Sequence, residues 1–171
     1  MDIDIALLIA KSKRGDNSAF SQLYSIYATD LYRFAVYMMG NEQDAEDAVQ
    51  EAVFSAWRNI HTLNDESLFK AWLFKILTNR CKTNLMKKNK VPDSLPIEEY
   101  TFLQDTQNSS FVSAELKEAL AALTPPDAQI ILLSIIGGFK SSELAEIYNM
   151  PAATIRTRQK RALGKLKEIL S

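Results

Sequence analysis

The sequence has very few of the residues that build disulfides, zinc sites and catalytic centres. Its 171 residues include one cysteine, Cys81, and one histidine, His61. A single cysteine cannot form an internal disulfide, and a structural zinc site needs a Cys/His cluster that this sequence lacks. There is no Gly-rich phosphate loop, and nothing around His61 suggests a base paired with a nucleophile. We therefore expect a protein that is not an enzyme and that needs no metal ion or cofactor.

Glycine, proline and long hydrophobic runs are also scarce. The chain has five Gly and five Pro, with 47% hydrophobic and 24% charged residues, which is typical of a globular protein rich in helix. No run approaches the ~18 apolar residues that a membrane-spanning helix needs. Acids precede the short N-terminal apolar run and no cleavage site follows it, so it is not a signal peptide. The composition predicts an all-α, soluble, cytoplasmic protein without membrane insertion.

The net charge of −1 hides a strong segregation of charge along the chain. Residues 40–51 contain five acids and no base, whereas residues 70–90 contain seven bases and no acid. Residues 91–124 are acidic, and the C-terminal segment is basic again. Such asymmetry suggests separate surfaces for separate partners.

Hydrophobic periodicity divides the chain into two helical parts. Apolar residues at i, i+3, i+4 spacing predict helices at about 2–13, from Asp16 or Asn17 to Gly40, at 42–58, and from about 69 onward. In the third helix we expect an inner face of Ala, Val and Trp57, and in the fourth an inner face that includes Phe69 and Trp72. The pattern then dissolves into turn residues and acids. We expect two small helical domains, at 1–90 and 112–171, joined by a flexible acidic linker at 91–111.

The C-terminal segment has the pattern of a helix-turn-helix. Thr124 and the following Pro125 predict the start of a helix, which Gly137 and Gly138 should end. A second helix, capped by Ser141 or Ser142, then precedes a turn and a last, basic helix. From Pro151 to Ser171 there are six Lys/Arg and one acid. Such a helix can read DNA in the major groove, through arginine forks to guanine or phosphate. The alternative is a solvated basic face on a small bundle. Four side chains are predicted to lie outward: Arg156, Thr157, Lys160 and Arg161.

Two earlier segments carry opposite charge on helical faces. Asp44, Asp47 and Glu51 are spaced i, i+3, i+7, a face that suits a basic protein partner better than a metal ion. Between Phe69 and Lys90 a stripe containing Lys75, Asn79 and Lys82 adjoins aromatic residues, a combination suited to opened nucleic acid. For Trp72 simple core packing is the preferred interpretation.

These segments together resemble the sigma-70 family of RNA polymerase sigma factors, in the small extracytoplasmic-function (ECF) group. Residues 44–58, DAEDAVQEAVFSAWR, resemble the signature of region 2, and residues 69–79, FKAWLFKILTN, resemble its promoter-melting helix. Residues 143–158, from ELAE to PAATIRTR, resemble region 4. The resemblance covers nearly the whole chain apart from the linker.

The resemblance implies a function in transcription initiation, with core RNA polymerase, promoter DNA and an anti-sigma factor as partners. The acidic helix would dock on the clamp helices of the β′ subunit, and region 4 would meet the β flap. The implied polymerase contacts are Asp44, Asp47, Gln50 and Glu51. The implied contacts to the minus-ten element are Asn64, Lys75, Asn79 and Lys82. The implied contacts to the minus-thirty-five element, which is read as duplex, are Arg156, Thr157, Lys160 and Arg161.

Two other functions are compatible with parts of the pattern. A stand-alone helix-turn-helix regulator would need neither the acidic helix nor the melting-type helix, so both features favour a sigma factor. A metal or phosphate enzyme using the carboxylates of residues 44–51 would need further ligands, which the sequence does not offer.

Ala153 and Lys160 differ from the residues common in relatives, which leaves the minus-thirty-five sequence open.

Overall fold

The computed structural model describes residues 3–89 and 113–171, and in these ranges all regular structure is helical. The expected linker at 91–111 lies outside the described residues. The N-terminal part contains α1 (Ile5–Lys13), α2 (Asn17–Met39), α3 (Glu42–Asn59), the short 3₁₀ turns η1 (Ile60–Thr62) and η2 (Glu66–Leu68), and α4 (Phe69–Asn89). The C-terminal part contains α5 (Ala114–Ala121), α6 (Pro125–Gly137), α7 (Ser141–Tyr148) and α8 (Ala152–Leu170). The all-α prediction is confirmed.

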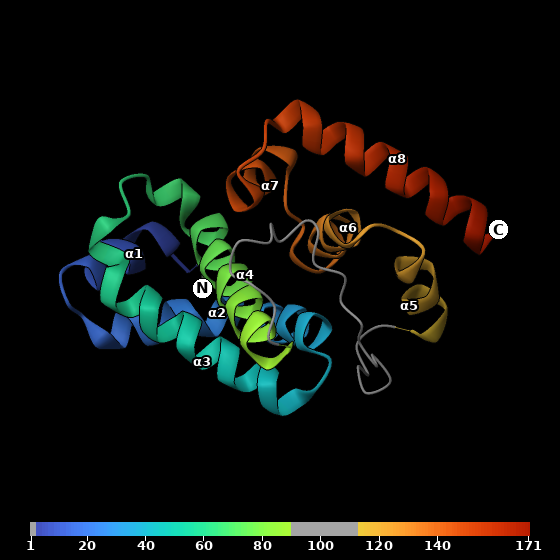
Figure 1. Cartoon of the computed structure of the whole chain (residues 1–171). Coiled ribbons are helices and arrows are strands. Elements are labelled where there is room, and N and C mark those ends of the chain that lie inside the picture. The colour runs from blue at the N-terminus through green and yellow to red at the C-terminus, as the bar shows by residue number, and fades with distance from the viewer. Residues whose placement is uncertain (1–2, 90–112) are drawn as a thin grey trace.

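Local capping signals set the ends of the N-terminal helices. The side chains of Asp4, Asp16 and Asn41 each accept a hydrogen bond from a backbone N–H in the first turn of α1, α2 and α3. Gly40 ends α2 in the left-handed region, with φ of 82°. The short link that follows lets α3 fold back along α2, and α4 then packs on both (Figure 1). The result is a compact helical bundle whose α3 and α4 lie side by side.

The C-terminal part is a helix-turn-helix preceded by two further helices. Thr124 and Pro125 begin α6 as predicted, and Gly138 ends it at φ 61°. Asn149, at φ 51°, makes the turn between α7 and α8. The expected cap at Ser141 or Ser142 is wrong. Lys140 takes the cap position instead, because Glu143 reaches back and accepts a hydrogen bond from the Lys140 N–H.

The two parts pack directly against each other. Helix α7 lies on α4 and α6 lies on α2 (Figure 1), and the buried apolar side chains of both parts belong to one continuous cluster. Phe139, in the loop between α6 and α7, meets Phe74 of α4 edge-to-face with ring centroids 4.9 Å apart. The structure therefore shows a closed arrangement of two units that the sequence pattern presented as separate.

Candidate functional site

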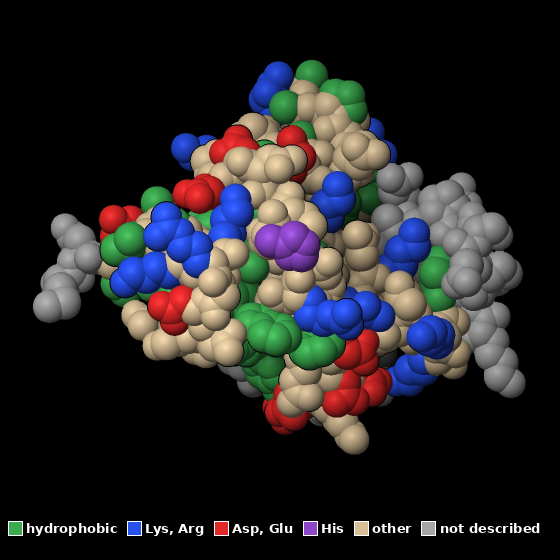
Figure 2. All heavy atoms as spheres, turned by 90° about the vertical axis from the view of Figure 1, so that its left-hand side faces the viewer, with side chains coloured by type: hydrophobic (Ala, Val, Ile, Leu, Met, Phe, Trp, Pro, Cys, Tyr) green, Lys and Arg blue, Asp and Glu red, His purple; other side chains and the backbone are tan. Residues whose placement is uncertain are grey.

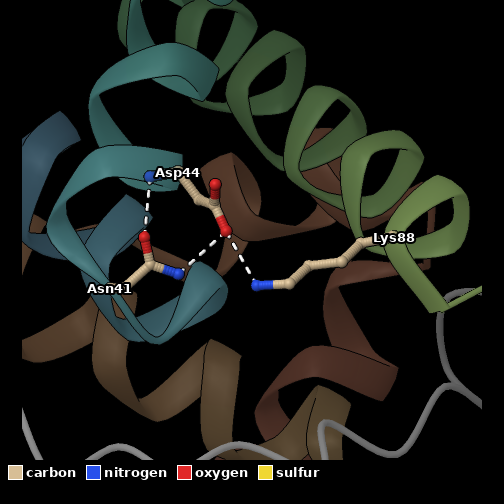
Figure 3. A network of polar contacts seen from close by, with 3 residues as sticks. All are labelled: Asn41, Asp44 and Lys88. Atoms are coloured by element: carbon tan, nitrogen blue, oxygen red, sulfur yellow. Dashed lines mark hydrogen bonds and ion pairs between the residues drawn. The ribbon is translucent and has the colours of Figure 1, made fainter.

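The N-terminal end of the acidic face is organised by a small polar network (Figure 3). The side-chain Oδ1 of Asn41 accepts a hydrogen bond from the Asp44 backbone N–H, and the side-chain amide of Asn41 donates to Asp44 Oδ2, both at 2.8 Å. Lys88 Nζ, from the end of α4, lies 2.9 Å from the same carboxylate oxygen. The hydrogen bond from Asn41, then that from Lys88, holds the pKa of Asp44 below its usual value. Asp44 is therefore a charged carboxylate held by two neighbouring side chains.

The rest of the acidic face is partly neutralised by the neighbouring helix. Arg80 Nε lies 3.4 Å from Glu51 Oε2, and the Asn84 amide donates to the same oxygen at 3.4 Å. Asp47 and Gln50 are exposed. The fold places the acidic α3 and the basic α4 side by side, with ion pairs between them.

Two exposed aromatic rings continue the acidic face toward the end of α3. Phe54 is 57% exposed and Trp57 43% exposed, with ring centroids 6.0 Å apart and the Arg58 guanidinium 5.7 Å from the Phe54 ring centre. The prediction that Trp57 is buried is wrong, because the indole lies at the edge of the bundle, where its N–H donates to Asn17 Oδ1 at 2.9 Å. Both rings were missed as functional candidates, although they follow Glu51 at the helical spacing of three. Figure 2 shows hydrophobic side chains gathered among charged ones on one face of the molecule. An open groove of ≈ 650 Å³ at this end of α3 is lined by Glu51, Phe54, Ser55, Arg58, Asn59, His61 and Arg80.

A second cavity lies between the η1–η2 loop and α4. The structure brings Asn64 and Lys75 together in its wall, while Asn79 and Lys82 lie farther along α4, exposed and half-exposed. The loop is anchored by Lys13, whose Nζ donates to the Leu63 carbonyl at 2.6 Å. The cavity holds ≈ 250 Å³ and is lined by Thr62, Leu63, Asn64, Asp65, Leu68, Ala71, Trp72, Lys75 and, from α7, Glu146.

Trp72 both packs against the core and lines the cavity. Its ring packs on Phe69 with centroids 5.9 Å apart, and it rests half-buried against the core. The same side chain contributes to the wall of the cavity. A large ring next to a lysine and an amide can stack on an unpaired base and hydrogen-bond to it.

Helix α8 carries two kinds of basic residue. Arg156, Thr157 and Lys160 are exposed. Arg161 Nη2 instead lies 3.2 Å from Asp127, a carboxylate only 4% exposed, which also binds Arg158 at 3.0 Å. The sequence pattern did not reveal this pairing, because Asp127 looked like a first-turn residue of α6 and lies more than thirty positions away. Arg161 is thus shared between a structural contact and the outer face.

Among residues 3–89 and 113–171 no group of three or more His, Cys, Asp or Glu side chains is placed to bind a metal ion. In the same ranges no helix combines the length and the apolar character that crossing a membrane requires.

Comparison with protein families matches both units separately. Residues 23–91 match the family description Sigma-70 region 2, and residues 113–166 match Sigma-70, region 4. The chain is 28% identical to the ECF RNA polymerase sigma factor SigW of Bacillus subtilis, over 99% of this chain and 98% of the relative. It is 30% identical to the ECF RNA polymerase sigma-E factor of Haemophilus influenzae, over 91% and 89%.

Solved structures show the same fold. The structure of CnrH in complex with the cytosolic domain of CnrY superimposes with a TM-score of 0.71 at 23% identity, covering 98% of this chain and 97% of that one. The sigma factor RpoE in complex with the anti-sigma factor NepR, from Bartonella quintana, gives 0.68 at 29% identity, covering 88% and 96%. With two regions matched in order and relatives similar over nearly their whole length, the chain belongs to the ECF group of the sigma-70 family, the RNA polymerase sigma factors that direct promoter-specific transcription initiation.

Proposed function

We propose that this sigma factor divides its work among three surfaces, the first of which is the exposed face of α3. Asp44, Asp47, Gln50 and Glu51 would bind the β′ clamp helices of core RNA polymerase, with Phe54 and Trp57 as apolar anchors beside them. The observation that carries this assignment is the continuity of exposed carboxylates and exposed aromatic rings along one helix. Exposed rings rimmed by charges are typical of protein interfaces.

The second surface is the cavity between the η1–η2 loop and α4. Asn64 and Lys75 share this cavity with Trp72, so an unstacked base of the minus-ten element would meet an amide and an aromatic face there, with Lys75 at a phosphate. Asn79 and Lys82 continue the same path along α4 and would contact the opened strand, Lys82 at a phosphate. Together they would hold the melted region of the promoter.

The third surface is the outer face of α8. Arg156, Thr157 and Lys160 are free to enter the major groove of the minus-thirty-five element, since all three are exposed. Arg161 would contact DNA only with the part of its guanidinium that Asp127 leaves available. The β flap of polymerase would position this unit, and the 91–111 segment would connect the two DNA contacts.

Further partners and properties follow from the same assignment. An anti-sigma factor is the expected regulator, a proposal supported by the likeness to RpoE, whose solved complex contains the anti-sigma factor NepR. We further propose that the protein acts in the cytoplasm, has no catalytic activity of its own and needs no cofactor, because the polymerase supplies the chemistry.

In vitro transcription with bacterial core polymerase tests this division. DNA sequences selected by the reconstituted holoenzyme would provide the cognate promoter, and transcription from it should depend on this protein. Reversing charge at Asp47 and Glu51 should abolish binding to core, whereas reversing the exposed Glu168 on α8 should not. Core binding that survives the first pair of changes would remove α3 from the docking surface.

A further inference from the structure

The candidate minus-ten cavity is completed by a residue from the other unit of the chain. Eight of its nine lining residues belong to the η1–η2 loop region and α4, and the ninth is Glu146 of α7. Glu146 places a carboxylate in the wall that contains Lys75. A bound DNA strand would bring phosphate, also an anion, to the same lysine.

A separate set of contacts holds α7 and its preceding loop against α4. Phe139 packs edge-to-face on the fully buried Phe74, and the Lys70 ammonium lies 4.3 Å from the centre of the Phe139 ring. Lys70 Nζ also donates a hydrogen bond to the Gly137 carbonyl at the end of α6. One lysine of α4 thus binds both the backbone and the ring of the loop that carries α7.

Gly137 is the residue that permits this arrangement. A Cβ added at position 137 would lie 2.5 Å from Cε2 of Phe139, so a larger residue must displace that ring. The contact between the units continues beyond Phe139. The buried Tyr148 of α7 and Cys81 of α4 belong to the same apolar cluster, against which Tyr37 of α2 also packs.

We propose that the helix-turn-helix unit competes with the promoter strand for the minus-ten cavity of the same chain, an inference that rests on the proposed function. In the free chain it docks on α4 through Phe139, and Glu146 lines the minus-ten cavity. The polymerase-docking residues Asp47, Gln50 and Phe54 stay exposed in this closed arrangement, as do the DNA-reading residues of α8. Core polymerase can therefore bind the closed chain first, and the units separate before the opened strand enters.

Two substitutions with matched controls separate the two parts of the proposal. Gly137→Ala should displace Phe139 and open the units, while Gly164→Ala, where an added Cβ meets nothing within 4 Å, is its control on α8. Glu146→Gln removes the carboxylate from the cavity, and Glu168→Gln makes the same charge change at an exposed position of α8. Circular dichroism of each variant shows whether its helices are retained.

The experiment measures closure and strand binding on the full chain without polymerase. Dyes on Ser21→Cys and Ser171→Cys, both exposed positions, report the separation of the units in a chain that also carries Cys81→Ala, because opening would expose this buried thiol to the dye. Fluorescent single-stranded oligonucleotides of random sequence report strand binding. We expect Gly137→Ala to lower energy transfer and Gly164→Ala to leave it unchanged. Glu146→Gln should strengthen strand binding about two- to fivefold relative to Glu168→Gln, the range for a partly exposed charge contact.

The outcomes that overturn the proposal are equally specific. Equal energy transfer in Gly137→Ala and Gly164→Ala would show that Phe139 does not hold the units together. Equal strand binding by Glu146→Gln and Glu168→Gln would show that the carboxylate does not compete with DNA. A chain that closes and opens as described but fails to start transcription with core polymerase would refute the proposed function and leave the internal competition standing.

Discussion

Arg156 and Arg158 lie two positions apart on α8 but meet different surroundings. Arg156 is exposed, whereas Arg158 is 26% exposed and bonded to the buried Asp127. Helical geometry turns residues two apart to different sides of the helix, so neighbouring arginines can serve DNA and the fold separately. The basic segment of the sequence is therefore a mixture of surface and structural charges.

Substituting these two arginines should give opposite results. Arg156→Ala should leave the free energy of unfolding nearly unchanged and weaken promoter binding by ~1–3 kcal/mol if the side chain forks onto a guanine. Arg158→Ala should lower the free energy of unfolding by about 1–3 kcal/mol, because it removes one partner of a buried carboxylate. Urea denaturation and binding to promoter duplex measure the two effects. A stability loss in Arg156→Ala as large as that in Arg158→Ala would contradict this division.

The side chain of Asn41 has two roles, since it caps α3 and donates a hydrogen bond to Asp44. Asn41→Ala should lower stability by about 1 kcal/mol through the lost cap, and the pKa of Asp44 should rise toward its ordinary value. Because the pKa of Asp44 is lowered in the folded state, its carboxylate contributes stability above the unfolded pKa of 3.8. This contribution is lost as the pH falls through the folded pKa. The difference between wild type and variant should thus be larger at pH 7 than below the folded pKa. Asn59→Ala, which removes a hydrogen bond only to its own helix, is the control for denaturation at both pH values.

At the scale of the element, α3 presents one buried and one functional face. Ala45, Ala48 and Ala52 are buried against the bundle, and their small size lets the neighbouring helices approach closely. Carboxylates and two aromatic rings occupy the outer face. The helix is therefore amphipathic in an unusual way, because part of its solvent side is apolar.

Truncating the exposed rings should separate binding from folding. Phe54→Ala and Trp57→Ala should weaken core polymerase binding, each by about 1–2 kcal/mol or more if it is an interface anchor, and change the unfolding free energy by only about 0.5 kcal/mol. Phe34→Ala, at a fully buried ring of α2, should by contrast cost about 3–5 kcal/mol in stability. Thermal denaturation and titration of labelled core polymerase test both statements. Unaltered core affinity in the double variant would exclude the rings from the interface.

For the molecule as a whole, the contact between the two units contains phenols that resist ionisation. Burial raises the pKa of Tyr37 to about 12, and burial, with the influence of Tyr37 and Cys81, raises the pKa of Tyr148 well above its ordinary value. The Tyr148 hydroxyl also hydrogen-bonds to the buried Gln129. These groups favour the closed, neutral form of the contact.

Stability should consequently fall in alkaline solution. Because burial raises the pKa of Tyr37 in the folded state, the stability that this residue contributes is fully present below the unfolded pKa of 10.0. This contribution is lost as the pH rises from 10 to the folded pKa of about 12. Denaturation midpoints should decline across this window together with energy transfer between the two units. Tyr37→Phe should weaken the dependence on pH, since it removes one of the titrating groups. A midpoint that is constant from pH 9 to 12 would disagree with this account.

The sequence by itself determined the helices and the family. Periodicity and start signals such as Asp16 and Thr124 are local, and the region 2 and region 4 patterns need only the order of residues. Local spacing also predicted which residues lie on the outer faces of two helices. These are the exposed acids of α3 and, on α8, Arg156, Thr157 and Lys160. One helical face can be read from spacing alone.

Only the tertiary structure decided which of those charges are free and what the two units do to each other. The partner of Arg161 is Asp127, the partner of Glu51 is Arg80, and Glu146 completes a cavity built by α4. Trp57, expected inside, proved to be half outside. Each of these facts depends on helices distant in sequence packing against one another, and the spacing of residues within one helix carries no information about which helix will cover it.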